Sequence, residues 1–217
     1  MALDIRGSLK KVKFNNNYYT VVDELFSNAV DSYLIRHHQA ENCPDFYAKF
    51  HVNFYDCDLE GREIGFSISL QDNGVGLGAE QTKAFITKDT SYKDDLNIAG
   101  IGKCKGSGRI QYLRYFSKIK IKSIYRDEDQ IFLKGLEIDD TKTKEIDESS
   151  FSLKQIENEE IGYEITLDSL KEDARLNISK WADPKKAFSA KELRNHILVS
   201  FLQRLVTLKD RLGSFQI

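Results

Sequence analysis

Five stretches of this sequence alternate apolar and polar residues, and this period-two pattern is the strongest constraint on its fold. Successive side chains of a β-strand point to opposite faces, so strands are predicted over 50–54, 64–70, 118–124, 132–138 and 163–167. Helical periodicity appears near both ends instead, over 18–36 and 191–212. The acidic, weakly patterned segment 139–160 is predicted to be a solvated excursion. This grouping predicts an α+β fold, a two-layer α/β sandwich with a mostly antiparallel sheet and helices on one face.

The composition is that expected for one globular domain over residues 1–217, located in the cytoplasm. The chain has 217 residues, of which 41% are hydrophobic and 30% charged, and its formal net charge is −2. A chain without a net basic field gives no direct indication of nucleic-acid binding. Three widely spaced cysteines, with no C-x-x-C pair, indicate neither a zinc site nor a disulfide framework. The first residues lack the apolar core of a signal peptide, and no apolar run is long enough to span a membrane.

The stretch AGIGKCKGSGRI, over 99–110, places four glycines beside three basic residues. Glycines let a ligand approach the backbone closely, and basic side chains attract anions, so the stretch is predicted to bind phosphate. It is not a P-loop, because no Gly-Lys-Ser/Thr follows at the required spacing. It also fails the dinucleotide pattern G-x-G-x-x-G, whose third glycine would arrive one residue late. A plain surface turn is the simpler interpretation of these glycines when they are considered alone.

The first predicted helix carries an unusual polar stripe in VVDELFSNAVDSY. Glu24, Asn28 and Asp31 are spaced at i, i+4 and i+7, so they share one side of the helix, opposite its apolar face. A solvated helix surface is the simplest interpretation of this stripe. Two carboxylates flanking a carboxamide could instead hold a hard cation and orient a water molecule.

A second polar motif, QDNGVGL, follows the strand predicted over 64–70. Asp-Asn-Gly is a strong signal for a tight turn, which is the simplest interpretation. Alternatively, Asp72 presents a carboxylate at the end of the strand, and Gly74 and Gly76 clear space for a flat ligand. A carboxylate there could accept a hydrogen bond from an exocyclic amine such as that of adenine.

Taken in order, these motifs resemble those of the GHKL, or Bergerat-fold, ATP-binding family, which includes gyrase, the heat-shock chaperone ATPase, mismatch-repair ATPases and histidine kinases. The family helix motif E-x-x-x-N-A-x-D is matched by Glu24, Asn28, Ala29 and Asp31. Its D-x-G-x-G motif is matched by Asp72, Gly74 and Gly76, and its glycine-rich lid by the stretch 99–110. A late threonine after a glycine is matched by Gly162 and Thr166 in GYEITL. The resemblance covers 18–125 and 162–167.

The resemblance implies a role for each matching residue. Asn28 would coordinate Mg²⁺ that bridges the phosphates of ATP, and Glu24 would be the general base for the attacking water. Asp72 would accept from the adenine amine with support from Thr166, and Gly76 would line the base pocket. The lid residues would wrap the phosphates with backbone N–H groups and add positive charge; they are Gly102, Lys105, Gly106 and Gly108. The lid departs from the family pattern at Cys104, where a glycine is expected.

The resemblance also implies an activity and a context. The chain is expected to be the ATP-binding domain of a Mg²⁺-dependent ATPase whose cycle drives conformational change or dimerisation. It is further expected to be the N-terminal part of a longer protein, to form a homodimer through downstream domains, and to hydrolyse ATP slowly in isolation. A nucleotide-binding sensor without hydrolysis, and an interaction module that binds no nucleotide, are the alternatives.

Overall fold

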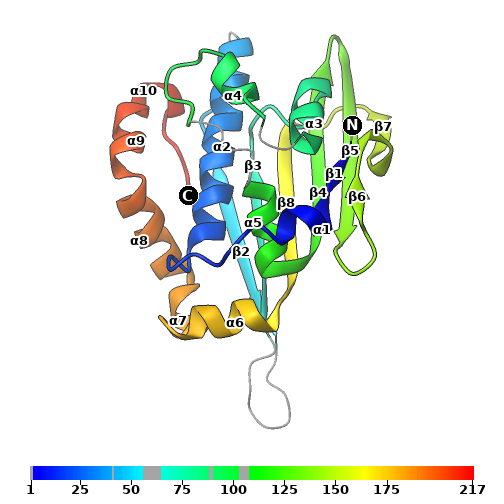
Figure 1. Cartoon of the computed structure of the whole chain (residues 1–217). Coiled ribbons are helices and arrows are strands. Elements are labelled where there is room, and N and C mark those ends of the chain that lie inside the picture. Colours follow the sequence, from blue (N-terminus) through cyan, green and yellow to red (C-terminus); the bar gives the residue numbers. More distant parts are fainter. Residues whose placement is uncertain (1, 41, 56–64, 88–89, 103–107) are drawn as a thin grey trace.

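A six-stranded antiparallel sheet organises the structure (Figure 1). The computed structural model describes all residues except 1, 41, 56–64, 88–89 and 103–107. In spatial order the strands are β2 (Ala48–Phe54), β3 (Phe66–Asp72), β8 (Gly162–Leu170), β4 (Phe116–Asp127), β5 (Gln130–Asp139) and β7 (Ser152–Ile156). Each strand pairs antiparallel with its neighbours. Two short strands, β1 (Leu3–Asp4) and β6 (Glu145–Ile146), pair separately.

Helices pack against this sheet, so the protein has an α+β fold. They are α1 (Ile5–Leu9), α2 (Thr20–Gln39), α3 (Ala79–Ile86), α4 (Tyr92–Asp95), α5 (Gly108–Tyr115), α6 (Glu172–Ser179), α7 (Pro184–Ala187), α8 (Ala190–Ser200), α9 (Leu202–Thr207) and α10 (Lys209–Leu212), with a 3-10 turn over Glu148–Ser150. Figure 1 shows α2 and α5 lying across the sheet, with α8, α9 and α10 along the outer side of α2. The long helix α2 is therefore held between the sheet and the C-terminal helices.

The alternation of residues in β4 gives this strand one buried face and one exposed face. Ile119 and Ile121 are each 2% exposed and belong to the core, whereas Lys118, Lys120 and Lys122 between and beside them are exposed. Burying the isoleucines against helices removes apolar surface from water, while the lysines keep their charge in solvent. The strand that this alternation predicts is confirmed, as are the other four predicted strands.

One cluster of buried apolar residues extends from Leu3 to Leu212. Helix α2 contributes strongly to it, since Val22, Phe26 and Val30 are fully buried. Phe26 contacts Phe201, just before α9, with ring centroids 4.9 Å apart. Because α2 has core contacts on more than one side, its polar stripe is confined to a narrow strip.

One expectation about element boundaries is wrong, and the expectation of a solvated segment over 139–160 is confirmed in its exposure but not in its lack of regular structure. The helix predicted over 191–212 is divided into α8, α9 and α10, because the backbone leaves helical geometry at Phe201 (φ −108°, ψ 8°) and Leu208 (φ −98°, ψ 3°). Segment 139–160 is also more regular than predicted, since it contains β6 and the edge strand β7. Strand β7 is exposed along most of its length, so it lacks the apolar alternation that marks a half-buried strand.

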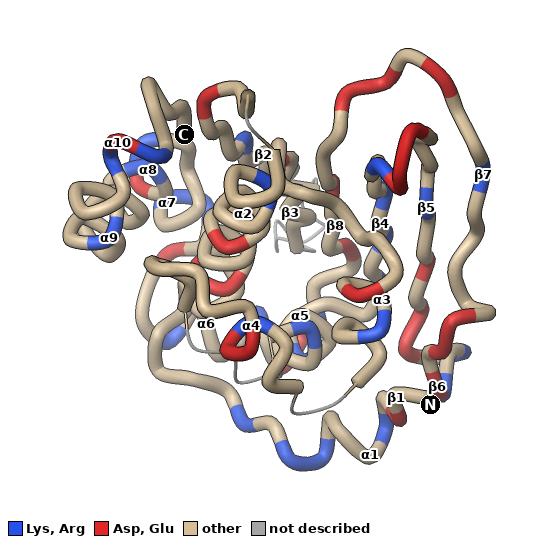
Figure 2. The backbone as a smooth tube through the Cα atoms, turned by 90° about the horizontal axis from the view of Figure 1, so that it is seen from above, with Lys and Arg blue, Asp and Glu red and all other residues tan. Residues whose placement is uncertain are grey.

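The C-terminal segment returns to the sheet beside the start of β2. The Phe46 N–H donates to the Leu212 carbonyl at 2.9 Å, and the Ala48 N–H donates to the Gln216 carbonyl at 3.0 Å. Figure 2 shows lysine and arginine side by side with aspartate and glutamate around the molecule. Within the described residues, no helix combines the length and apolar character needed to cross a membrane.

Candidate functional site

A cavity of about 540 Å³ lies between α2, α5 and the sheet. Its lining differs from one part to another. Apolar side chains from both layers form one part of the wall, among them Ile35, Leu70, Val75, Leu77 and Ile165. The three residues of the α2 stripe, together with Asp72, Gly76 and Gly108, also line it. A cavity of this size, with one apolar part of its wall and many polar side chains on the rest, can hold a small molecule that has both an apolar and a charged part.

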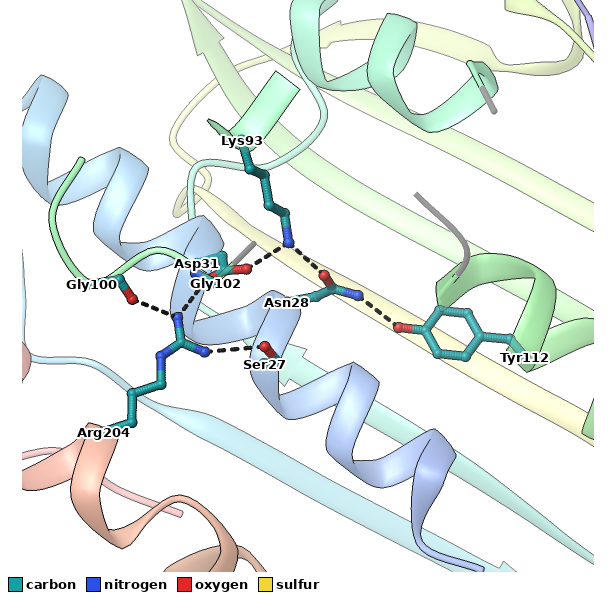
Figure 3. Close-up of polar contacts among 8 residues, drawn as sticks. All are labelled: Ser27, Asn28, Asp31, Lys93, Gly100, Gly102, Tyr112 and Arg204. Carbon is teal, nitrogen blue, oxygen red and sulfur yellow. Dashed lines mark hydrogen bonds and ion pairs between the residues drawn. The ribbon is translucent and has the colours of Figure 1, made fainter. Parts of the chain in front are cut away.

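The α2 stripe faces this cavity, so its interpretation as a solvated helix surface is wrong. Asp31 is only 2% exposed. Its carboxylate accepts hydrogen bonds from Lys93 Nζ at 2.6 Å and from the Gly102 N–H at 3.0 Å, and it also pairs with the Arg204 guanidinium (Figure 3). A buried carboxylate requires such partners because removing it from water is costly.

The Asn28 side chain is fixed at both ends. Its Nδ2 donates to the Tyr112 hydroxyl at 3.0 Å, and its Oδ1 accepts from Lys93 Nζ at 2.7 Å (Figure 3). An ammonium group can only donate, so the amide oxygen, not the nitrogen, must face Lys93. Asn28 therefore presents an oxygen toward Lys93 and a nitrogen toward α5.

Asp72 ends β3 with its carboxyl buried, and it is 2% exposed. Its Oδ1 accepts from the Gly74 N–H at 2.8 Å, which leaves the second oxygen for another partner. Burial raises the pKa of Asp72 to about 7, and the Gly74 N–H and the Arg36 guanidinium oppose this rise. Arg36 itself donates to the Asn73 and Ile161 carbonyls at 2.8 and 3.0 Å, which ties the end of α2 to the turn after β3.

The turn after Asp72 requires glycine at position 76. Gly76 has φ +78°, and a Cβ there would lie 2.7 Å from the Ile124 carbonyl oxygen. Two serines hold the turn on either side. Ser32 Oγ accepts from the Val75 N–H at 3.1 Å, and Ser123 Oγ accepts from the Leu77 N–H at 2.7 Å. The turn is thus pinned between α2 and β4, with Gly76 at the cavity wall.

The glycine-rich stretch is only partly described, since Lys105 and Gly106 lie outside the described residues. The two predicted glycines that are described lie near the α2 stripe. Gly102 donates its N–H to Asp31, and Gly108 begins α5 beside Glu24. A Cβ at Gly108 would lie 2.5 Å from Glu24 Oε2, so glycine permits this close approach.

Thr166 is not brought to the cavity. Its neighbour Ile165 and the more distant Tyr163 line the cavity, whereas Thr166 does not. The reason is strand geometry, because adjacent side chains of β8 point to opposite faces of the sheet. Thr166 pairs with Ser69 and Lys120 across the sheet, and Lys120 is exposed. The expectation that Thr166 supports Asp72 is therefore corrected.

Sequence reasoning missed several residues of the site. Tyr112 and Tyr163 line the cavity from α5 and β8, and Arg204 reaches Asp31 from α9. Desolvation on burial raises the pKa of both tyrosines above its usual range. The sequence offers one signal for Lys93, its place in SYKDD shortly before the glycine-rich stretch, which fits an exposed loop equally well.

Comparison with known proteins adds no further assignment. No protein-family model matches this sequence, and no characterised protein matches it with significance. Among the described residues, no group of three or more histidine, cysteine, aspartate or glutamate side chains could hold a metal by itself. The geometry of the cavity must therefore carry the functional argument.

Proposed function

We propose that this chain is a Mg²⁺-dependent ATP-binding domain of the GHKL type that hydrolyses ATP, with its helices and sheet forming the two-layer Bergerat sandwich. One observation carries the proposal. Glu24, Asn28, Asp72, Gly76 and Gly108, which belong to three separate sequence motifs, line a single cavity. Motifs that matched by chance would have no reason to converge on one cavity.

The wall near Asp72 suits an adenine ring. Apolar side chains such as Leu70, Val75 and Ile165 can pack against the faces of a planar ring, and Gly76 has no side chain to fill the space. The second oxygen of Asp72 is a hydrogen-bond acceptor when the carboxyl is ionised. It can accept from the exocyclic amine of adenine, whereas the oxygen at the same position of guanine is itself an acceptor.

The residues on α2 fit a bound magnesium ion. Mg²⁺ prefers oxygen ligands and typically takes only one or two from protein, with water and phosphate oxygens completing its shell. Asn28 Oδ1 is an oxygen that already contacts a cation, Lys93 Nζ, at 2.7 Å. Asn28 would therefore hold the metal, which would neutralise phosphate charge when bound.

Glu24 supports hydrolysis as well as binding. Its carboxylate lines the cavity one helical turn from Asn28 and lies beside Gly108 at the start of α5. A carboxylate in this position can take a proton from a water molecule that attacks the terminal phosphate. A sensor that only binds nucleotide would have no use for such a base.

Nucleotide titration by calorimetry tests the proposal. We expect ATP and ADP to bind in Mg²⁺ buffer and GTP to bind much more weakly. Asp72→Asn should weaken ATP binding about tenfold or more, because the amide oxygen is used by the Gly74 N–H and the amide nitrogen then faces the adenine amine, a buried mismatch.

The matched control is Asp129→Asn, which makes the same chemical change in the exposed turn between β4 and β5. It should bind ATP as the unaltered protein does. Equal affinity for ATP and GTP, or unchanged affinity in Asp72→Asn, would refute the adenine assignment, and no binding of any adenine nucleotide would refute the function.

A further inference from the structure

Among the described residues, the Asp31 carboxylate pairs with more than one cation. One buried carboxylate faces two cations, the Lys93 ammonium and the Arg204 guanidinium, whose side chains are 21% and 20% exposed. Arg204 also donates to Ser27 Oγ at 3.1 Å and to the Gly100 carbonyl at 3.0 Å, so it is held in place by three partners (Figure 3). Arg204 alone can neutralise Asp31, so Lys93 is a second cation on the same carboxylate.

Lys93 is also the cation that can leave. It lies on the short helix α4, which is fixed to α3 through the hydrogen bond from Gln81 Nε2 to the Tyr92 hydroxyl at 2.7 Å. Its long, flexible side chain reaches across the cavity to Asn28 and Asp31 on α2. A lysine is a compact point charge on a flexible stem, so it can change partners without movement of the helix that carries it.

This second cation also occupies the Asn28 oxygen that is proposed to hold Mg²⁺. Two cations cannot share the same face of one amide oxygen, because their charges repel at such short range. We propose that Lys93 is a built-in substitute for Mg²⁺: its ammonium occupies the metal-binding oxygen of Asn28, supports phosphate binding without metal, and gives up that oxygen when Mg²⁺ binds with the nucleotide. This inference rests on the proposed function.

The proposal predicts an effect that depends on metal. Lys93→Met keeps the length and apolar stem of the side chain but removes its charge. In EDTA, its affinity for ATP should fall about tenfold or more, the loss expected for one charge-assisted contact. In Mg²⁺, where Lys93 no longer holds Asn28, the affinity should change little. The affinity in Mg²⁺ divided by the affinity in EDTA should therefore rise about tenfold.

Calorimetric titration of ATP in both buffers makes the measurement. Lys83→Met, the same change at an exposed position of α3, is the matched control and should leave the ratio unchanged. Lys93→Arg, which keeps the charge, should retain most of the metal-free affinity and shows that a loss in Lys93→Met is electrostatic. Thermal melts verify that each variant folds.

The possible outcomes distinguish failure of the Lys93 proposal from failure of the proposed ATP-binding function. Equal losses of affinity in the two buffers would make Lys93 a structural support only and overturn the proposal. Unchanged affinity in both buffers would overturn it as well. Metal-free binding that is already undetectable in the unaltered protein would overturn it too, while leaving the ATP assignment intact. Absence of nucleotide binding in both buffers would refute the proposed function itself, and this inference with it.

Discussion

At the scale of single residues, Asp72 makes a prediction about stability that needs no ligand. Its pKa is raised to about 7 by burial, whereas an aspartate in the unfolded chain titrates near 3.8. Between these values the folded protein holds a proton that the unfolded chain has released. The contribution of Asp72 to stability therefore falls as the pH rises from about 4 to about 7 and is constant above that.

Urea denaturation of the unaltered protein and of Asp72→Asn, at pH 4.5 and pH 7.5, measures this effect. The stability of the unaltered protein relative to the variant should be greater at pH 4.5, by on the order of 3 kcal/mol. The comparison with the variant cancels the titration of other groups. A difference that is the same at both pH values would show that Asp72 is ionised throughout.

Glu24 makes the prediction that separates an ATPase from a binding module. Glu24→Ala should bind ATP with nearly unchanged affinity and lose hydrolysis by ~10²–10⁴-fold, because a positioned general base contributes that much. Phosphate release at steady state is the measurement, with Glu80→Ala, an exposed glutamate of α3, as the control. Turnover that persists in a preparation free of contaminating ATPase would remove Glu24 from this role.

Residue patterns predicted part of this site and failed on the rest for a physical reason. The motifs on α2 and after β3 are local, so their residues keep their spacing, and most of them line the cavity; the predicted site residue Gly74 does not. Thr166 was assigned by its place in the sequence, but a strand turns each successive side chain to the other face, and order along the chain does not specify the face. Lys93 and Arg204 reach Asp31 from distant segments, and no local pattern marks such a meeting.

At the scale of whole elements, the C-terminal helices hold the start of the glycine-rich stretch. Arg204 of α9 bonds the Gly100 carbonyl, and Arg211 of α10 donates to the Ala99 carbonyl at 2.7 Å. The sequence predicted one continuous helix here. The breaks at Phe201 and Leu208 reorient the chain, and neither position is a glycine or proline that would have signalled them.

Loss of Arg204 should affect both stability and binding. Arg204→Gln removes a charged partner of the buried Asp31 and should lower the free energy of unfolding by about 1.5–3 kcal/mol. ATP affinity should fall as well, because the backbone at Gly100 loses its anchor. Denaturation and calorimetry measure the two effects, and Arg194→Gln on the exposed side of α8 is the control. A variant with unchanged stability would show that Lys93 and Gly102 alone satisfy Asp31.

At the scale of the whole molecule, one core joins both ends of the described chain. Buried residues from Leu3 to Leu212 belong to one cluster, and the C-terminal segment pairs with the backbone at the start of β2. The helices and the sheet therefore have little apolar surface that is buried independently of the other layer. The sequence predicted both layers from their two periodicities, although the pairing order of the strands is set by contacts distant in sequence.

Unfolding should follow one cooperative transition as a result. Circular dichroism and hydrogen exchange should report the same midpoint, and ATP at about one hundred times its dissociation constant should raise the stability of the whole unit by ~2.7 kcal/mol. Two separate transitions, or a shift confined to one of the two probes, would show that the layers unfold independently.

The turn around Gly76 has a consequence for how this gene can vary. Gly76 combines a backbone angle that other residues rarely adopt with a neighbouring carbonyl oxygen where a Cβ would have to be. At Gly102, by contrast, a Cβ would meet no described atom closer than 3.7 Å, and the backbone angle is ordinary. Under random mutagenesis with selection for a functional site, codon 76 should remain glycine in every survivor, whereas codon 102 should drift to alanine without penalty.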